Sequence, residues 1–304
     1  MNSIPTEQNT ERQLQRLAAQ RQLYATAKKV FGMQLVLSGP IAVTWASVTF
    51  VFPVLKGYVA LWGIAVTLLD LFWLTPWQKR LRDSAARIQE LFDCEVLSLS
   101  WNELKAGKRP DPELVKEQAT KYQTWAATMP PVANWYGKEV AALPLHVARI
   151  ACQRSNCWWD AKQRRRYAVW IISGVVAIFA VVLTAGLKTG LTLEDFILKV
   201  AAPLAPALVL GIRQVSEQMD TANRLDKLKE HAERLWGEAL SGSPETEITL
   251  KTRNLQDEIL ENRKRGAMVF DWVFKRLRSD YETQMNHGVA EFVVEAKQRL
   301  GLSP

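Results

Sequence analysis

The densest group of side chains that could bind a ligand lies in the segment 154–166, which mixes arginine, lysine and tryptophan. Arginine forms paired hydrogen bonds with phosphate oxygens, and aromatic rings stack on nucleobases in proteins that bind single strands. This combination predicts a site for an anionic second messenger. The candidate ligand-binding residues are Arg154, Asn156, Trp158, Trp159 and Lys162.

A membrane-interface belt explains the same residues and is the commoner reason for such a cluster. In a belt, basic side chains contact lipid phosphates and tryptophan rings lie at the depth of the headgroups. The three consecutive arginines fit this alternative best. The basic residues predicted to lie at a membrane interface are Lys28, Lys29, Lys79, Arg80, Arg164, Arg165 and Arg166.

A second group of candidates lies inside long apolar stretches. An acid inside a membrane span costs free energy and by default marks a functional site. Two tryptophans follow Asp70 closely, so a position at the membrane interface is equally compatible with the sequence. Prolines free backbone carbonyls that can line water, and small residues let helices approach closely. We predict as pore or gate residues Asp70, Pro203, Pro206 and Gly211, with ordinary packing of a kinked helix as the alternative.

No motif in the sequence predicts catalysis. The three histidines are scattered, and the three cysteines lack the spacing of a zinc site or a disulfide framework. A Walker loop, a GxGxxG motif and a GxSxG motif are all missing from the sequence. We therefore expect no enzyme activity, no catalytic residue, no cofactor and no metal site.

The elements that must position these residues are four apolar blocks. About 20 apolar residues are needed to cross a hydrocarbon core of about 30 Å. The fourth block is short and carries Lys199 near its start, so it could instead be a re-entrant or broken helix. In the first block, Gly39-Pro40 should kink the helix. The blocks are Val30–Leu55, Gly57–Thr75, Tyr167–Leu187 and Phe196–Ile212.

The net charge of +8 indicates how these spans are oriented. The basic residues gather beside the apolar blocks, which favours membrane lipids as the partner rather than a DNA or RNA polymer. Nearly all of them flank the same side of the membrane, so the positive-inside rule places both termini in the cytoplasm. The polar N-terminus shows no cleavable signal peptide, and the first span should act as the insertion signal.

The predicted fold is an all-α membrane protein with two transmembrane hairpins and an α-rich cytoplasmic domain. That domain should combine the segment between the hairpins with the C-terminal region. Asp111-Pro112 should open a helix, the segment 94–101 could be a short strand or a helical turn, and Ser243-Pro244 should start a helix that includes Leu255 and Leu277. The expected boundaries are 1–29 (N-terminal helix), 30–77 (hairpin 1), 78–166 (cytoplasmic), 167–212 (hairpin 2) and 213–304 (cytoplasmic helices).

Three segments, Leu17–Lys29, Gly107–Val115 and Ala148–Trp170, resemble the SMODS-associated four-transmembrane effectors of bacteria. The resemblance extends over essentially the whole chain, because the order of hairpins and cytoplasmic segments is also similar. It implies a pore-forming effector of anti-phage defence in the inner membrane. A cyclic oligonucleotide would trigger it to permeabilise the membrane and to arrest or kill the infected cell. The resemblance supplies no established site residues.

Four helices with so few polar side chains cannot enclose an aqueous path, so a pore requires a homo-oligomer. Two other functions remain open. A constitutive ion channel or transporter would conduct without a signal, although the inverted repeats common in transporters are missing. A membrane-anchored scaffold would recruit a partner and never conduct.

Overall fold

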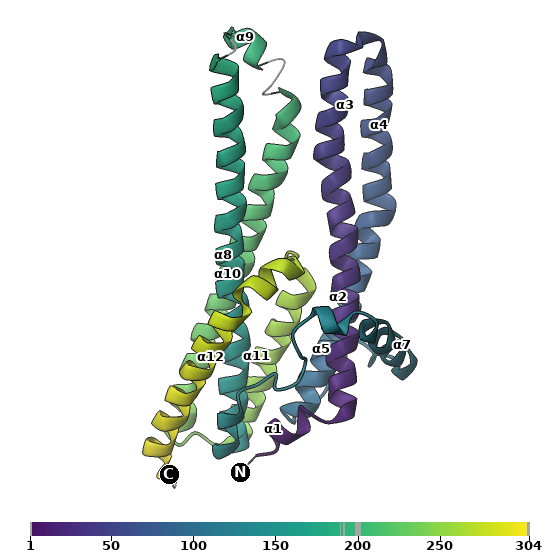
Figure 1. The fold of residues 1–304 in the computed structure, drawn as a ribbon. Helices are drawn as coiled ribbons and strands as arrows, with labels where there is room; N and C mark the ends of the chain where they lie inside the picture. The colour runs from purple at the N-terminus through teal and green to yellow at the C-terminus, as the bar shows by residue number, and fades with distance from the viewer. Residues whose placement is uncertain (1, 189, 191, 198–201, 303–304) are drawn as a thin grey trace. The chain divides into compact units, whose positions relative to one another are not determined.

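The computed structural model describes the whole chain except residues 1, 189, 191, 198–201 and 303–304. Within the described residues every regular element is a helix and none is a strand (Figure 1), which confirms the all-α prediction there. The helices divide into two units. Unit 1 comprises Met1–Thr26, Leu81–Arg164 and Thr221–Pro304, and unit 2 comprises Ala27–Arg80 and Arg165–Asp220.

The first half of unit 2 is an interrupted helical hairpin. A Cβ atom at Gly39 would lie 2.8 Å from the carbonyl oxygen of Leu35, and a proline at the first position of a helix needs no hydrogen-bond acceptor for its nitrogen. The predicted kink therefore becomes a break between two helices. The elements are α2 (Glu11–Ser38), α3 (Pro40–Val51), the 3-10 helix η1 (Pro53–Leu55), α4 (Lys56–Leu69), the π-helix η2 (Asp70–Leu74) and α5 (Thr75–Val96).

The second half of unit 2 contains α8 (Leu145–Lys188), the short α9 (Leu193–Phe196) and the beginning of α10 (Ala202–Leu240). A Cβ atom at Gly211 would lie only 2.7 Å from Cγ2 of Val175. The absence of a side chain at Gly211 thus lets α10 approach α8 closely.

Among the described residues, two helical stretches are long and apolar enough to cross a membrane, Gly57–Val96 and Leu145–Lys188. The other two predicted spans are not among the helices that meet this criterion in the described residues. Gly39 divides the first into two pieces, and the fourth, with Lys199, falls partly outside the described residues. Large apolar side chains of unit 2 are exposed, for example Trp73 at 64% and Val181 at 69%. Apolar helices with apolar residues on their outer faces are typical of membrane spans.

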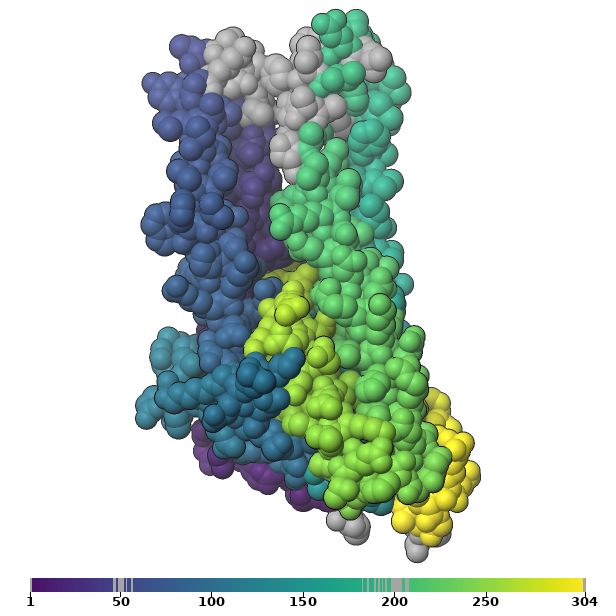
Figure 2. All heavy atoms as spheres, turned by 180° about the vertical axis from the view of Figure 1, so that it is seen from behind, coloured from purple at the N-terminus to yellow at the C-terminus, as the bar shows by residue number. Residues whose placement is uncertain are grey.

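Unit 1 is a helical domain with its own apolar core, which includes Phe92, Leu97, Ile150, Leu235 and Leu255. Parts of α2, α5, α8 and α10 contribute to it. The short helix α6 (Glu103–Ala106) packs against α11, and Figure 2 shows the two on one surface. The remaining elements are α1 (Ile4–Glu7), α7 (Pro112–Gln123), the 3-10 helices η3 (Ala126–Thr128) and η4 (Lys138–Ala142), α11 (Glu245–Arg265) and α12 (Asp271–Leu300).

Local sequence signals predicted some boundaries of unit 1. Helix α7 begins at Pro112 after the N-cap Asp111, as predicted. The segment 94–101 is helical as far as Val96 and then turns, with Ser98 at a φ of 50°. It contains no strand, so the helical-turn alternative is confirmed.

The long helix predicted after Ser243-Pro244 is wrong, because the chain breaks at Gly266 into α11 and α12. A Cβ atom at Gly266 would lie 3.0 Å from the carbonyl oxygen of Asn262 and 3.2 Å from Nη2 of Arg164. A side chain here would therefore be tightly packed against Asn262 and Arg164, and the backbone leaves the helix in an extended conformation with φ −60° and ψ 140°.

We predict that Phe92→Ala strongly destabilises unit 1. The Phe92 side chain is 0% exposed, and its ring centroid lies 6.1 Å from that of Tyr136 and 6.2 Å from that of Trp135. Loss of the ring should lower the free energy of unfolding by about 3–5 kcal/mol, because a cavity replaces a packed aromatic ring. Chemical denaturation in detergent, followed by tryptophan fluorescence, measures the change.

The matched control is Leu104→Ala, because the Leu104 side chain is 93% exposed. Its effect should stay within about 0.5 kcal/mol. Equal effects of the two substitutions would contradict the assignment of Phe92 to the core.

Candidate functional site

Part of the predicted ligand cluster lies on unit 1, where α8 packs against α12. The ring of Tyr281 is 6.3 Å from that of Trp158 and 6.0 Å from that of Trp159, and the ring of Phe274 is 6.3 Å from that of Trp159. All angles are tilted or edge-to-face, as aromatic pairs prefer. We call Trp158, Trp159, Lys162, Phe274 and Tyr281 the aromatic–cationic surface.

Three cations lie over the rings of this surface. Nζ of Lys162 is 4.8 Å from the ring centre of Trp158 and 5.1 Å from that of Tyr281. The guanidinium groups of Arg21 and Arg278 lie 5.7 and 5.9 Å from the ring centre of Phe274. Burial lowers the pKa of Arg21 from its ordinary value. The arrangement offers rings for stacking and cations for an anionic group.

Sequence reasoning missed the contribution of α12 and of Arg21. Phe274, Arg278 and Tyr281 lie four and three residues apart and so share one helix face, which is the only local signal in the sequence. Arg21 lies on α2, far from both helices in the chain, and only the tertiary structure brings it to Phe274.

Arg154 and Asn156 were predicted as ligand residues, but both side chains are engaged inside unit 1. Nη2 of Arg154 lies 2.8 Å from Oε1 of Glu233, and its guanidinium lies 4.5 Å from the ring centre of Phe292. Asn156 donates a hydrogen bond of 3.1 Å to the hydroxyl oxygen of Tyr136. The structure therefore brings together Trp158, Trp159 and Lys162, with Lys162 also donating a hydrogen bond to Gln284, and gives the other two residues partners within unit 1.

Arg164 also differs from its prediction as an interface residue. Its side chain is buried in unit 1, with Nε 2.9 Å from Oδ1 of Asp160 and Nη1 donating to the carbonyl oxygen of Ala267 at 2.6 Å. The break at Gly266 provides this carbonyl. The other predicted interface residues lie in unit 2, where Lys29, Lys79, Arg80 and Arg166 are exposed and Lys28 and Arg165 are half-buried.

The predicted pore residues all lie in unit 2. Asp70 is the first residue of the π-helix η2 and is half-buried. Pro203 is the second residue of α10 and Pro206 the fifth. Gly211 packs against Val175 of α8.

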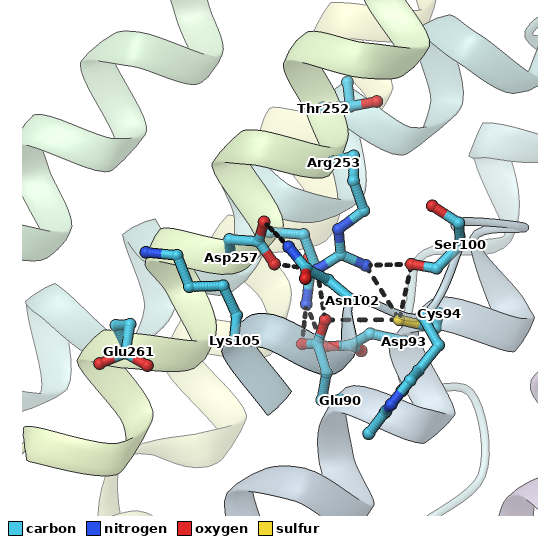
Figure 3. Close-up of polar contacts among 12 residues, drawn as sticks. Glu90, Asp93, Cys94, Ser100, Asn102, Lys105, Thr252, Arg253, Asp257 and Glu261 are labelled. Carbon is cyan, nitrogen blue, oxygen red and sulfur yellow. Dashed lines mark hydrogen bonds and ion pairs between the residues drawn. The ribbon is translucent and has the colours of Figure 1, made fainter. Parts of the chain in front are cut away.

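Unit 1 also contains a set of buried charges that the sequence did not reveal (Figure 3). Glu90 and Asp93 on α5 are 1% and 0% exposed. Nη2 of Arg253 lies 2.6 Å from Oε1 of Glu90 and 2.9 Å from Oδ1 of Asp257, and Nη1 of Arg263 lies 2.5 Å from Oδ2 of Asp93. We call these three acids and two arginines the buried charge network.

Neutral side chains complete the buried charge network. Gln256 donates to Oε2 of Glu90 at 2.8 Å and to Oδ2 of Asp93 at 3.0 Å. Asn102 donates to Oδ2 of Asp257 at 2.7 Å, and the hydroxyl of Tyr136 donates to Oδ1 of Asp93 at 2.6 Å. Buried ions persist when their remaining donors and acceptors are satisfied in this way.

Burial and the neighbouring charges set the protonation of this network. Burial raises the pKa of Glu90 above its ordinary value, although Arg253 opposes the shift. Burial alone would lower the pKa of Arg253, but the Glu90 carboxylate raises it overall, so the guanidinium stays charged. Burial and Asp93 raise the pKa of Tyr136. Tyr136 is therefore a hydrogen-bond donor at neutral pH.

Helix α8 connects the network to the aromatic–cationic surface. Gln153 donates to Oε1 of Gln256 at 3.0 Å, and Asn156 donates to Tyr136, which donates to Asp93. Trp158 follows Asn156 by two residues on the same helix. A displacement of α8 at the surface would therefore disturb the partners of Asp93.

Other reactive groups form no further site in the described part of the chain. No group of three or more His, Cys, Asp or Glu residues could hold a metal ion there. Cys94, Cys152 and Cys157 are free and buried. Burial raises the pKa of Cys157 to about 12, so this thiol is not a nucleophile at neutral pH.

We predict that Arg253→Met lowers the free energy of unfolding by about 3–5 kcal/mol at neutral pH, because Glu90 and Asp257 lose their buried cation. The loss should shrink as the pH falls. The pKa of Glu90 in the folded protein already lies above its ordinary value. Between the pKa of the unfolded chain and that of the folded protein, the contribution of Glu90 to stability therefore decreases as the pH rises. Removal of Arg253 raises the folded-state pKa of Glu90 further and so widens the pH range over which stability falls. Denaturation curves at several pH values measure this.

The matched control is Arg265→Met, since the Arg265 side chain is 76% exposed. It should change stability by less than about 0.5 kcal/mol. Adding Glu90→Gln to Arg253→Met should restore part of the loss. A deficit of Arg253→Met that is independent of pH would contradict the assignment.

Comparison with known proteins agrees with the sequence resemblance. A family model described as the SMODS-associating 4TM effector domain matches residues 2–292. The chain is 23% identical over 279 residues to a protein of Bacillus cereus (strain VD146) described as a probable CBASS effector molecule; the match covers 88% of this chain and 90% of that protein. No solved structure matches the chain. Because the family model covers nearly the whole chain, the predicted resemblance is confirmed, and the protein belongs to the SMODS-associating 4TM effector domain family.

Proposed function

We propose that this protein is a bacterial inner-membrane effector of anti-phage defence that forms a pore when a cyclic oligonucleotide binds. The observation that carries the proposal is the effector-family match over residues 2–292, in a chain with helices of membrane-spanning length. The CBASS description of the Bacillus cereus relative supports the same role.

In this proposal unit 2 lies in the membrane and crosses it four times. Its exposed apolar side chains support contact with lipid. Exposed basic residues, among them Lys79, Arg80, Arg166 and Arg213, flank the apolar stretches. Following the positive-inside rule, we place unit 1 and both termini in the cytoplasm, where a messenger is made.

The messenger binds at the aromatic–cationic surface in this proposal. Trp158 and Trp159 provide ring faces and Lys162 provides a cation, which suits a ligand that combines bases with phosphates. Arg154 and Asn156 hold α8 in place through Glu233 and Tyr136. Helix α8 continues from this surface to Lys188 without a break, so a shift at the surface acts on the apolar part of the same helix.

The pore itself requires several copies of the chain. One copy supplies too few polar side chains to line water, so we propose a homo-oligomer whose pore or gate includes Asp70, Pro203, Pro206 and Gly211. The close contact of Gly211 with Val175 supports a gate in which a change in packing between α8 and α10 opens or closes the path.

We predict that liposomes containing the purified protein release a trapped dye when one member of a panel of cyclic di- and trinucleotides is added. Lys162→Gln should raise the nucleotide concentration for half-maximal release by about 10- to 150-fold, the equivalent of about 1.5–3 kcal/mol for a hydrogen bond to a charged group. The control Lys116→Gln, at an exposed position of α7, should leave the release curve unchanged.

Two outcomes would contradict this proposal. Release without any nucleotide would support a constitutive channel instead. No release across the panel, from protein shown to be folded and oligomeric, would exclude a cyclic-nucleotide-gated pore and favour a membrane-anchored scaffold. Thermal unfolding of Lys162→Gln separates a binding defect from a folding defect.

A further inference from the structure

Asp70 is the one acid in the charge-poor stretch 30–75, whose other charged residue is Lys56. At 1.5 Å per residue, Asp70 lies about 20 Å along the helix from Gly57 and about 14 Å from Lys79. A hydrocarbon core is about 30 Å thick. The carboxylate of Asp70 therefore lies within the apolar layer if Gly57 marks one edge and Lys79 the other.

The hydrogen bonds of Asp70 involve one of its two carboxylate oxygens. Oδ1 accepts from Nε2 of Gln34 at 2.5 Å and from Oγ1 of Thr75 at 3.2 Å. Nε2 of Gln34 also lies 3.0 Å from Oγ1 of Thr75. Because a charged carboxylate can only accept hydrogen bonds, both neighbours act as donors that fix its orientation.

The second oxygen, Oδ2, accepts no hydrogen bond in the described part of the chain, and no ion pair there includes Asp70. Gln34 and Thr75 are neutral, so they orient the carboxylate without balancing its charge. Asp70 is half-buried, and Oδ2 is not among the enclosed side-chain atoms that lack a partner, so Oδ2 is accessible. A charged carboxylate in an apolar layer needs water or a cation as a partner.

The backbone around Asp70 is also unusual. The helix changes from α to π at Asp70 and returns to α at Thr75. Single π-helical turns inside α-helices occur frequently at functional sites. Asp70 and Thr75 lie at the two ends of this turn, and both contact Gln34 of α2.

From these observations we infer that the Asp70 carboxylate binds permeant monovalent cations and makes the pore cation-selective. The inference rests on the proposed pore function and adds its substrate class. In a homo-oligomer each copy would contribute one carboxylate, and rings of acidic side chains produce cation selectivity in channels. Gln34 and Thr75 are positioning residues, because they direct Oδ1 and leave Oδ2 to the ion.

The conduction test uses full-length protein in planar bilayers with a potassium chloride gradient, opened by the cyclic nucleotide that releases dye from liposomes. The wild type should show a reversal potential close to the potassium equilibrium potential. Asp70→Asn keeps the acceptor oxygen and removes the charge, so the reversal potential should shift towards zero. Asp70→Glu should retain most of the preference.

The matched control is Asp220→Asn, the same chemical change at an exposed residue outside the apolar stretches. It should leave the reversal potential unchanged. Conduction by the wild type without preference for potassium, or with a preference that Asp70→Asn does not reduce, would overturn the inference and leave the pore intact.

A second measurement does not require an open pore. Dicyclohexylcarbodiimide modifies carboxyl groups in apolar surroundings, and mass spectrometry locates the adduct. Potassium chloride should slow the labelling of Asp70 severalfold relative to choline chloride at equal ionic strength, and Asp70→Asn should remove the adduct. Protection without conduction would overturn the pore and leave a cation site. Labelling at equal rates in both salts would overturn the cation site itself.

Discussion

The requirement that buried charges be balanced governs the packing of unit 1. Helix α5 buries Glu90 and Asp93 against α11, and Arg253 and Arg263 of α11 supply the compensating charges. Gln256, Tyr136 and Asn102 satisfy the remaining oxygens. Gln256 of α11 donates to Glu90 of α5 and accepts from Gln153 of α8, so these contacts link the three helices. Apolar packing alone would tolerate sliding.

Both proposed functions, binding of the messenger and formation of the pore, depend on helix α8. Its first half contributes Gln153 and Asn156 to the surroundings of the network and Trp158, Trp159 and Lys162 to the aromatic–cationic surface. The whole helix, Leu145–Lys188, is one of two helical stretches in the described part of the chain that are long and apolar enough to cross a membrane, and its second half holds the charge-free residues 167–187. The three acids of the buried charge network are paired with arginines, whereas the hydrogen-bond partners of Asp70 in unit 2, Gln34 and Thr75, are neutral. The buried charges of unit 1 are thus paired with each other, whereas the Asp70 carboxylate has a free oxygen where we propose that ions pass.

Much of the fold could be predicted because its signals are local. The apolar blocks, the proline-opened helix at Pro112 and an irregularity at Gly39-Pro40, predicted as a kink and found as a break, depend on neighbouring residues. Contacts between distant segments were not predictable. The break at Gly266 lies where Arg164 approaches the chain, and Arg154, a predicted ligand residue, forms an ion pair with Glu233.

The sequence by itself determined that the protein is all-α, that it carries apolar segments of membrane-spanning length, and that it resembles an effector family. Helical periodicity, charge-free length and family motifs are all properties of short segments. The tertiary structure alone decided that Glu90 and Gln256, 166 residues apart, share a hydrogen bond, and that Arg21, Phe274 and Trp159 meet on one surface. The partners in such pairings cannot be read from the sequence, because the helix periodicity of each segment shows which residues share a face and not which distant segment packs against it. Only the packing that buries these side chains reveals which of them must find a partner.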